Sequence, residues 1–196
     1  PTYTTTSTIK MLPMGRKYRY SNRKKHQTDS RSCINQLGRS PRVESISMVD
    51  YTIEVTIEAV DALNSMRQIS GNENGGILLG SEINEKYYRI NRASEPCILI
   101  DRSSKCGCTR NANKANEIIK REFESSNRTR FYLGEWHTHP EDNPTPSTVD
   151  ISSIHDVFYK SEIVIDGVFL AIVGRKSIFW GFYEGTQMHN IDVIMI

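Results

Sequence analysis

The stretch Gly134–Asp150 reads GEWHTHPEDNPTPSTVD and joins the end of a strand to the start of a helix through a loop with three prolines. On a strand, alternate side chains share one face, so His137 and His139 point the same way. The prolines fix the backbone and stiffen the turn. Ser147 stands where a helix begins, and Asp150 lies in its first turn. The stretch therefore predicts a helix start folded back over a pair of strand histidines.

Two imidazoles and one carboxylate can form a three-ligand zinc site in which the fourth position is left for water. Such a site lowers the pKa of its water and polarises a carbonyl group. The pattern Ser-x-x-Asp also has a purely structural interpretation, because Ser147 can cap the helix and Asp150 suits the positive end of its dipole. We expect both to hold, since a cap at Ser147 would orient the turn that offers Asp150.

Hydrolysis at such a site also needs a base for the water. Glu73 lies in SGNENGG (residues 70–76), immediately before a short apolar run, and a carboxylate at the mouth of a sheet can reach a metal-bound water. Spacing alone leaves Glu135 and Glu141 as rivals for this role. Glu135 shares the face of His137 on the strand, so it is also a candidate outer partner of that ligand.

The rest of the pattern predicts a sheet covered by helices, of class α/β or α+β. Alternating and apolar runs predict strands at residues 52–57, 75–80, 86–92, 97–100, 131–139, 163–173 with a break near Gly167, and 178–183. Helical spacing of apolar residues predicts helices at 59–69, 116–125 and 147–159. A polar loop is expected at 106–113, and a last apolar stretch covers 191–196.

Composition describes a soluble globular protein, with 24% charged and 37% hydrophobic residues. The longest apolar runs are strand-sized, so we expect no membrane span, and the first 15 residues show no signal peptide. Four cysteines in 196 residues are too few for a typical disulfide scaffold. Reduced thiols and a cytoplasmic location are therefore the prediction.

The first 47 residues differ in kind from the rest, since ten lysines and arginines face only two acids there. They show no helical or strand period and few large apolar residues, which predicts a disordered basic arm before a domain at 48–196. A basic arm can bind nucleic acid or a membrane surface. It can equally be a solvated tail, or sequence upstream of the true start, because Met48 stands where the periodic pattern begins.

Two motifs together carry a family resemblance. The run ENGGILLG (73–80), followed by H-T-H-x7-S-x-x-D (137–150), resembles the JAMM motif of the JAB/MPN metalloprotease family, over roughly residues 48–196. The resemblance implies a JAB/MPN-type mixed sheet flanked by helices, with Zn²⁺ on His137, His139 and Asp150. It implies that Glu73 is the general acid and base, and that Ser147 donates a hydrogen bond to the tetrahedral oxyanion. None of these groups is missing, so catalysis is expected.

A narrower resemblance concerns the prokaryotic JAB branch, to which GEWHTHPE with P-T-P-S-x-x-D is similar. That branch includes the deconjugating peptidase of type II CBASS antiphage operons. It implies hydrolysis of a peptide or isopeptide bond at the C-terminus of a ubiquitin-like or conjugated protein, here a cGAS-like nucleotidyltransferase. The implied partners are a protein substrate conjugated through its C-terminus and an E1–E2-like conjugating enzyme, with neither nucleic acid nor membrane.

Two other functions remain open at this point. One is a non-catalytic MPN-type scaffold with structural zinc, which a fourth ligand from Cys106 or Cys108 would favour. The other is a DNA-associated JAB protein, akin to the RadC-like branch, that uses residues 1–47 on nucleic acid.

Overall fold

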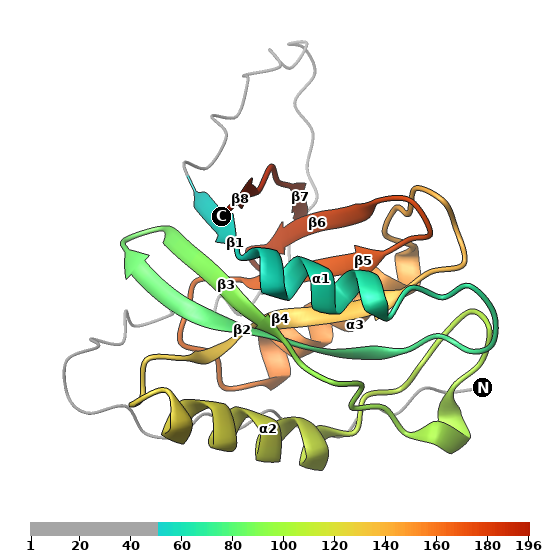
Figure 1. Cartoon of the computed structure of the whole chain (residues 1–196), viewed down its shortest axis with the longest axis horizontal. Helices are drawn as coiled ribbons and strands as arrows, with labels where there is room; N and C mark the ends of the chain where they lie inside the picture. The colour runs from blue at the N-terminus through green and yellow to red at the C-terminus, as the bar shows by residue number, and fades with distance from the viewer. Residues whose placement is uncertain (1–50) are drawn as a thin grey trace, which may run out of the picture. The chain divides into compact units, whose positions relative to one another are not determined.

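The computed structural model describes residues 51–196, in which eight strands form one mixed sheet and three α-helices pack against it (Figure 1). The strands are β1 (Thr52–Val55), β2 (Gly75–Asn84), β3 (Tyr87–Ala93), β4 (Phe131–Thr138), β5 (Val168–Val173), β6 (Ile178–Tyr183), β7 (Met188–Asn190) and β8 (Ile194–Met195). The helices are α1 (Ile57–Ser65), α2 (Ala112–Ser125) and α3 (Thr148–Lys160), with one 3₁₀ turn, η1 (Ile100–Arg102). The predicted class of a mixed sheet flanked by helices is confirmed. The predicted arm, residues 1–47, lies outside the described residues.

Three chain segments meet at one end of the central strands. Strand order is β7-β6-β5-β4-β2-β3-β1-β8, with β4 antiparallel to β2 and parallel to β5. Helix α3 makes the crossover between the parallel strands β4 and β5. The end of β4, the beginning of β2 and the beginning of α3 therefore meet at the same end of the strands.

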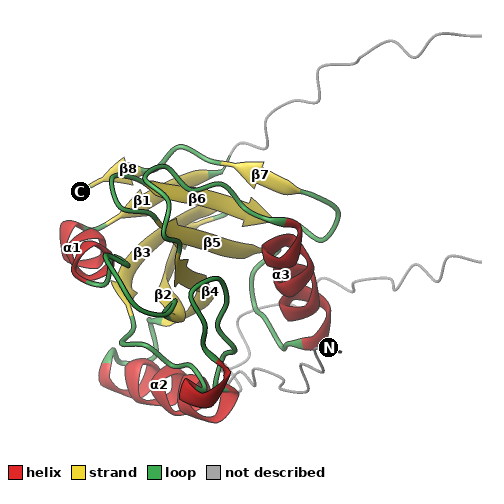
Figure 2. Ribbon diagram, turned by 90° about the vertical axis from the view of Figure 1, so that its right-hand side faces the viewer, coloured by secondary structure: helices red, strands yellow, loops and turns green. Residues whose placement is uncertain are grey.

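Helices lie on both faces of the sheet (Figure 2). Helices α2 and α3 share one buried apolar cluster with alternate residues of β2 and β5, including Ile77, Leu79, Leu170 and Ile172. Helix α1 packs against β3 from the other face, where the side chains that alternate with that cluster point. Burial on both faces explains why β5 is apolar throughout (VFLAIV) rather than alternating.

Paired glycines at the start of β2 allow a close approach to β4. A Cβ atom on Gly76 would stand 2.6 Å from the indole nitrogen of Trp136. A Cβ atom on Gly75 would stand 3.1 Å from the sulfur of Cys108 and 3.4 Å from the Cβ of His137. A side chain at Gly76 is therefore excluded by the ring of Trp136, while one at Gly75 would require its neighbours to shift by a few tenths of an ångström.

The first predicted strand ends two residues early. Thr56 stops the alternation because its side chain accepts a hydrogen bond from the backbone of Ala59 and caps α1. The strand predicted to reach residue 57 therefore ends at Val55, and the helix predicted at 59–69 runs from Ile57 to Ser65.

Four other predicted bounds are wrong. The strand predicted at 75–80 continues to Asn84 as β2. The segment 97–100 is no strand: Ile98 makes one bridge with Arg110, and the 3₁₀ turn follows. Helix α2 begins four residues before its predicted start, because Asn111 caps it and its side chain accepts from the backbone of Lys114. The strand predicted at 163–173 begins only at Val168, after the expected break at Gly167.

The C-terminal part of the described chain pairs more than the sequence indicates. Strand β7, which the sequence did not predict, pairs antiparallel with β6 at the end of the strand order. Of the last apolar stretch, 191–196, only Ile194–Met195 forms a strand, which pairs parallel with β1.

Candidate active site

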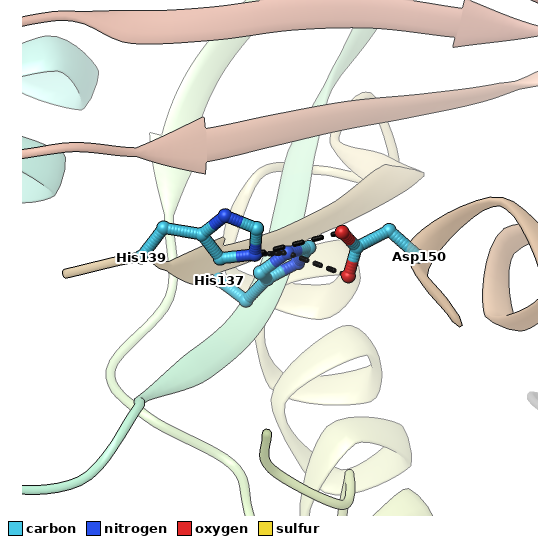
Figure 3. Close-up of side chains that lie close together, drawn as sticks. All are labelled: His137, His139 and Asp150. Atoms are coloured by element: carbon cyan, nitrogen blue, oxygen red, sulfur yellow. Dashed lines mark hydrogen bonds and ion pairs between the residues drawn. The ribbon is translucent and has the colours of Figure 1, made fainter. Parts of the chain in front are cut away.

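Three side chains converge where β4 ends and α3 begins (Figure 3). The Nε2 atoms of His137 and His139 lie 3.1 Å apart. The carboxylate of Asp150 faces both, with Oδ1 at 3.1 Å from Nε2 of His137 and Oδ2 at 3.5 Å from Nε2 of His139. The structure thus brings together the three residues that the sequence suggested as metal ligands.

The spacing of these atoms is compatible with a shared metal ion. Nitrogen and oxygen ligands about 2.0–2.1 Å from zinc lie about 3.3 Å from one another at the corners of a tetrahedron. The two histidine nitrogens lie 3.1 Å apart, and each lies close to a different oxygen of Asp150, at 3.1 Å and 3.5 Å, so that one ligand atom from each residue lies within 4.8 Å of the others. Within residues 51–196, His137, His139 and Asp150 are the group of acids, histidines and cysteines that could hold an ion, and no thiol belongs to it.

Backbone pairing with the neighbouring strands determines which way the side chains of His137 and His139 point. His137 stands opposite Gly75 of β2, so its ring passes over a position without a side chain. The backbone N–H of His139 donates to the carbonyl of Val173 at 3.0 Å, which continues the strand direction one residue past β4. Thr138, between them, points to the opposite face and is fully buried.

A capping box at the start of α3 holds Asp150. The backbone N–H and the hydroxyl of Ser147 each donate to Oδ2 of Asp150 at 2.7 Å. The backbone N–H of Asp150 donates back to the Ser147 hydroxyl at 3.2 Å. The capping interpretation is therefore confirmed, and the same carboxylate also reaches the histidines.

Electrostatics favour a charged carboxylate at this position. Burial alone would raise the pKa of Asp150. Hydrogen bonds to His137 and His139, together with the Ser147 hydroxyl, outweigh burial and hold the pKa well below its ordinary value. An ionised oxygen donor beside two imidazoles is a donor set that zinc prefers.

Glu73 lies on the same side of the sheet as the histidines. Since Gly75 pairs with His137, the position two residues earlier faces the ligand pair. Glu73 is only 5% exposed, and burial raises the pKa of its carboxyl, while the charges of His137 and His139 act in the opposite direction. Among residues 51–196, no lysine or arginine forms an ion pair with it.

The two rival carboxylates are placed differently. Glu135 accepts from the Arg110 guanidinium at 2.5 Å and from the Tyr132 hydroxyl at 2.7 Å, rather than from an imidazole. Glu141 is 57% exposed, and its nearest oxygen lies 3.9 Å from Nδ1 of His139, the nitrogen that points away from Asp150. Of the three candidates, Glu73 alone is both buried and free of a cationic side-chain partner within the described chain.

A cysteine-containing loop borders the site. The sulfur of Cys108 lies over Gly75, beside His137, and burial followed by the charge of Glu73 raises the pKa of this thiol to about 12. Cys106 is exposed and lines a hollow of about 310 Å³ together with Pro140. Neither thiol belongs to the group of His137, His139 and Asp150, so the structure gives no support to a four-ligand structural site.

Several residues around the site carry no sequence signal. Arg110 and Tyr132 hold Glu135, but they stand far from each other in the chain and only folding reveals the network. Gln68 and Thr138 bond to each other across 70 residues of sequence. For Thr138, strand alternation does predict that it points away from the two histidines.

One end of the central strands thus gathers two histidines, an aspartate and a buried glutamate, and the first three of these residues could hold a metal ion. The chain belongs to the family of prokaryotic homologs of the JAB domain, whose model matches residues 61–183. No described helix has both the length and the apolar character that crossing a membrane requires.

Characterised relatives share most of the domain. A protein of Escherichia coli (strain TW11681) and one of Vibrio cholerae serotype O1, both named CD-NTase/cGAS isopeptidase, are each 36% identical over 134 residues. These alignments cover 67% of this chain and 82% and 81% of the relatives. A Pseudomonas aeruginosa protein of the same name is 39% identical over 119 residues, covering 61% of this chain and 73% of its own.

The fold also has a solved counterpart. A Desulfitobacterium hafniense protein, whose structure was determined in solution, superposes with a TM-score of 0.56 at 16% identity. The match covers 74% of this chain and 93% of that protein. At this identity the likeness concerns the fold alone.

Proposed function

We propose that this protein is a zinc-dependent JAMM isopeptidase that releases a cGAS-like nucleotidyltransferase from proteins to which its C-terminus is conjugated, in bacterial antiphage defence of the CBASS type. The observation that carries the proposal is the cluster of His137, His139 and Asp150 with the buried Glu73 on the same side of the sheet. The names of the relatives support the substrate class.

Each residue has a role that follows from its position. His137, His139 and Asp150 would hold the zinc ion through Nε2, Nε2 and a carboxylate oxygen. When bound, zinc supplies a Lewis acid that polarises the scissile carbonyl and acidifies a water molecule. The capping box keeps Asp150 in place before any metal arrives, which reduces the cost of organising the site.

Glu73 moves the proton. Its carboxylate takes a proton from the attacking water as the new C–O bond forms, and it returns that proton to the leaving amine as the C–N bond breaks. The products are a free C-terminal carboxylate and a free amine.

Ser147 would stabilise the oxygen that becomes negative. Its hydroxyl now donates to Oδ2 of Asp150, and the backbone N–H of Ser147 donates to the same oxygen at the same 2.7 Å. The hydroxyl can therefore turn toward a substrate oxygen while the backbone bond still holds Asp150. A donor aimed at a developing oxyanion contributes about 100-fold or more to the rate.

The test is hydrolysis of defined conjugates by the purified protein. The substrate is a cGAS-like nucleotidyltransferase joined through its C-terminus either to a lysine side chain or to the N-terminus of a second protein. Mass spectrometry of the products identifies the bond that breaks. We expect cleavage directly after the C-terminal residue of the nucleotidyltransferase, with the lysine-linked conjugate cleaved at least as fast as the linear one.

Two controls make this experiment decisive. Glu73→Gln should leave the conjugate intact while the protein stays folded. A conjugate with an unrelated C-terminal tail should also resist cleavage. Equal cleavage of both tails would overturn the proposed substrate, and unchanged activity of Glu73→Gln would overturn the proposed base.

A further inference from the structure

A buried glutamine lies beneath the loop that carries Glu73. Gln68 follows α1 and is 5% exposed. Its amide nitrogen donates to two carbonyls, that of Gly71 at 3.0 Å and that of Lys105 at 3.1 Å. Its amide oxygen accepts from the hydroxyl of Thr138 at 3.4 Å. One side chain thus joins three separate segments of the chain.

Thr138 connects this glutamine to the ligand strand. It lies between His137 and His139, and its hydroxyl accepts from the backbone N–H of Asn74 at 3.0 Å. The backbone N–H of Thr138 donates to the carbonyl of Asn74 at 2.9 Å. Hydrogen bonds therefore hold the backbone on both sides of Glu73. Asn74, the next residue, bonds to Thr138, and the carbonyl of Gly71, two residues before Glu73, accepts from Gln68.

Gln68 is also connected to the 103–105 segment, which binds the backbone of Glu73. The backbone N–H of Glu73 donates to the carbonyl of Ser104 at 2.8 Å, and the Ser103 hydroxyl donates to the carbonyl of Glu73 at 2.8 Å. The next carbonyl in that segment, that of Lys105, accepts from Gln68. The loop that clamps the backbone of Glu73 is thus tied to Gln68 as well.

Glu73 needs this support because, among the described residues, no lysine or arginine forms an ion pair with its carboxylate. Its carboxylate is positioned by its backbone, and the backbone by hydrogen bonds to Gln68, Thr138 and the 103–104 segment. A displacement of a reacting group by about 1 Å can slow a reaction about 100-fold.

We infer that Gln68 and Thr138 form a positioning pair that sets the catalytic carboxylate of Glu73 against the histidine ligands. The inference rests on the proposed function. Thr138 is fully buried and points away from the ligand face, so it contacts neither the substrate nor the metal. Gln68 is 5% exposed, and it acts on Glu73 through the loop carbonyls that its amide binds. Loss of the pair should therefore reduce kcat and leave zinc content and KM nearly unchanged.

Two substitutions test the pair. Thr138→Val keeps the shape of the side chain and removes the hydroxyl, while Thr138→Ser keeps the hydroxyl. Gln68→Leu removes both donors to the loop carbonyls, and Gln187→Leu, at an exposed glutamine beyond β6, is its matched control. We expect kcat to fall about 100-fold in Thr138→Val and Gln68→Leu, with KM within about threefold of wild type. Thr138→Ser and Gln187→Leu should retain activity close to wild type.

Hydrogen exchange separates positioning from folding. In Thr138→Val, the backbone amides of Glu73 and Asn74 should exchange faster, while those of β5 and β6 keep their wild-type rates. Acceleration throughout the sheet, or loss of zinc in the same variant, would overturn the inference in favour of a merely structural role. So would a raised KM with unchanged kcat. If the wild type cleaves no conjugate, the proposed function fails, and the exchange rates still decide whether the pair controls the Glu73 loop.

Discussion

Two glutamates of this domain are equally buried and differently surrounded. Glu122 on α2 is 4% exposed, and Glu73 before β2 is 5% exposed. Glu122 accepts from the Arg130 guanidinium at 2.7 Å and has Arg92 and Arg121 at 3.6 Å. Glu73 faces two imidazoles and the carboxylate of Asp150, with no arginine or lysine paired to it in residues 51–196.

The difference supports the roles proposed for the two carboxylates, structural for Glu122 and catalytic for Glu73. Removing a carboxylate from water is unfavourable, and three arginines offset that cost at Glu122. At Glu73 the cost is offset only by groups that are themselves candidate ligands, and burial raises its pKa. Perturbed carboxylates in such surroundings cluster at functional sites. The comparison predicts that Glu73 contributes to activity and Glu122 to stability.

The largest effect is expected for Glu73→Gln. An amide cannot accept the proton from water, so kcat should fall by about 10³-fold or more. The melting temperature should stay at or above that of wild type, because a neutral amide is less costly to bury than a carboxylate. Steady-state hydrolysis and thermal melts of the same preparation measure both. A large fall in melting temperature would place Glu73 with Glu122 and remove the distinction.

Ser147→Ala should have the next largest effect on the rate. It removes both hydrogen bonds that the hydroxyl makes with Asp150 and the proposed donor to the oxyanion, so kcat should fall about 100-fold. Loss of the helix cap should also lower the free energy of unfolding by about 1 kcal/mol. Ser147→Thr keeps both functions of the hydroxyl and serves as the control. Full activity in Ser147→Ala would limit this residue to capping.

Glu122→Gln should reverse the pattern seen at Glu73. Removing the charge weakens its hydrogen bond to Arg130 and two longer contacts with arginines that are more than half exposed. The free energy of unfolding should fall by about 2 kcal/mol, as measured by urea denaturation. Activity per folded molecule should match wild type. A fall in kcat without loss of stability would contradict the structural role of Glu122.

The smallest effect concerns Glu54 on β1, which lies between β3 and β8. Hydrogen bonds from the Tyr87 hydroxyl and then from Arg89 hold the pKa of Glu54 below its ordinary value. The folded-state pKa is below that of the unfolded chain, so this carboxylate stabilises the fold above about pH 4.3 and stops doing so as the pH falls through the folded-state pKa. The difference in melting temperature between wild type and Glu54→Gln should therefore be constant near neutral pH and narrow as the pH falls below about 4.3. A difference that does not narrow in acid would show that another contact is responsible.

The site was more predictable from sequence than the fold around it. Alternation along a strand determines that His137 and His139 share a face, and a capping pattern determines where Asp150 lies in its helix. Spacing alone left Glu135 as a rival of Glu73, and only the structure reveals that Glu135 is bound by Arg110 and Tyr132. Those contacts join residues distant in the chain, and no local period encodes them.

Element bounds failed where a side chain competes with the backbone pattern. Thr56 and Asn111 cap helices inside segments that their neighbours favour as strand or loop. Residues 97–100 have strand-like composition, but the chain turns at η1 after a single bridge. The hydrogen bonds of Gln68 and Thr138 were invisible for a different reason, since buried polar pairs have no sequence period.

The most direct test of the central claim is metal content measured together with cleavage. The wild type and Asp150→Asn are purified, stripped with a chelator and titrated with Zn²⁺, and each sample is assayed on the lysine-linked nucleotidyltransferase conjugate. The wild type should lose activity on chelation and regain it at about one zinc per chain. Asp150→Asn should bind zinc much more weakly and stay inactive at that ratio. Cleavage that survives complete removal of metal, or an Asp150→Asn protein as active as wild type, would contradict the account.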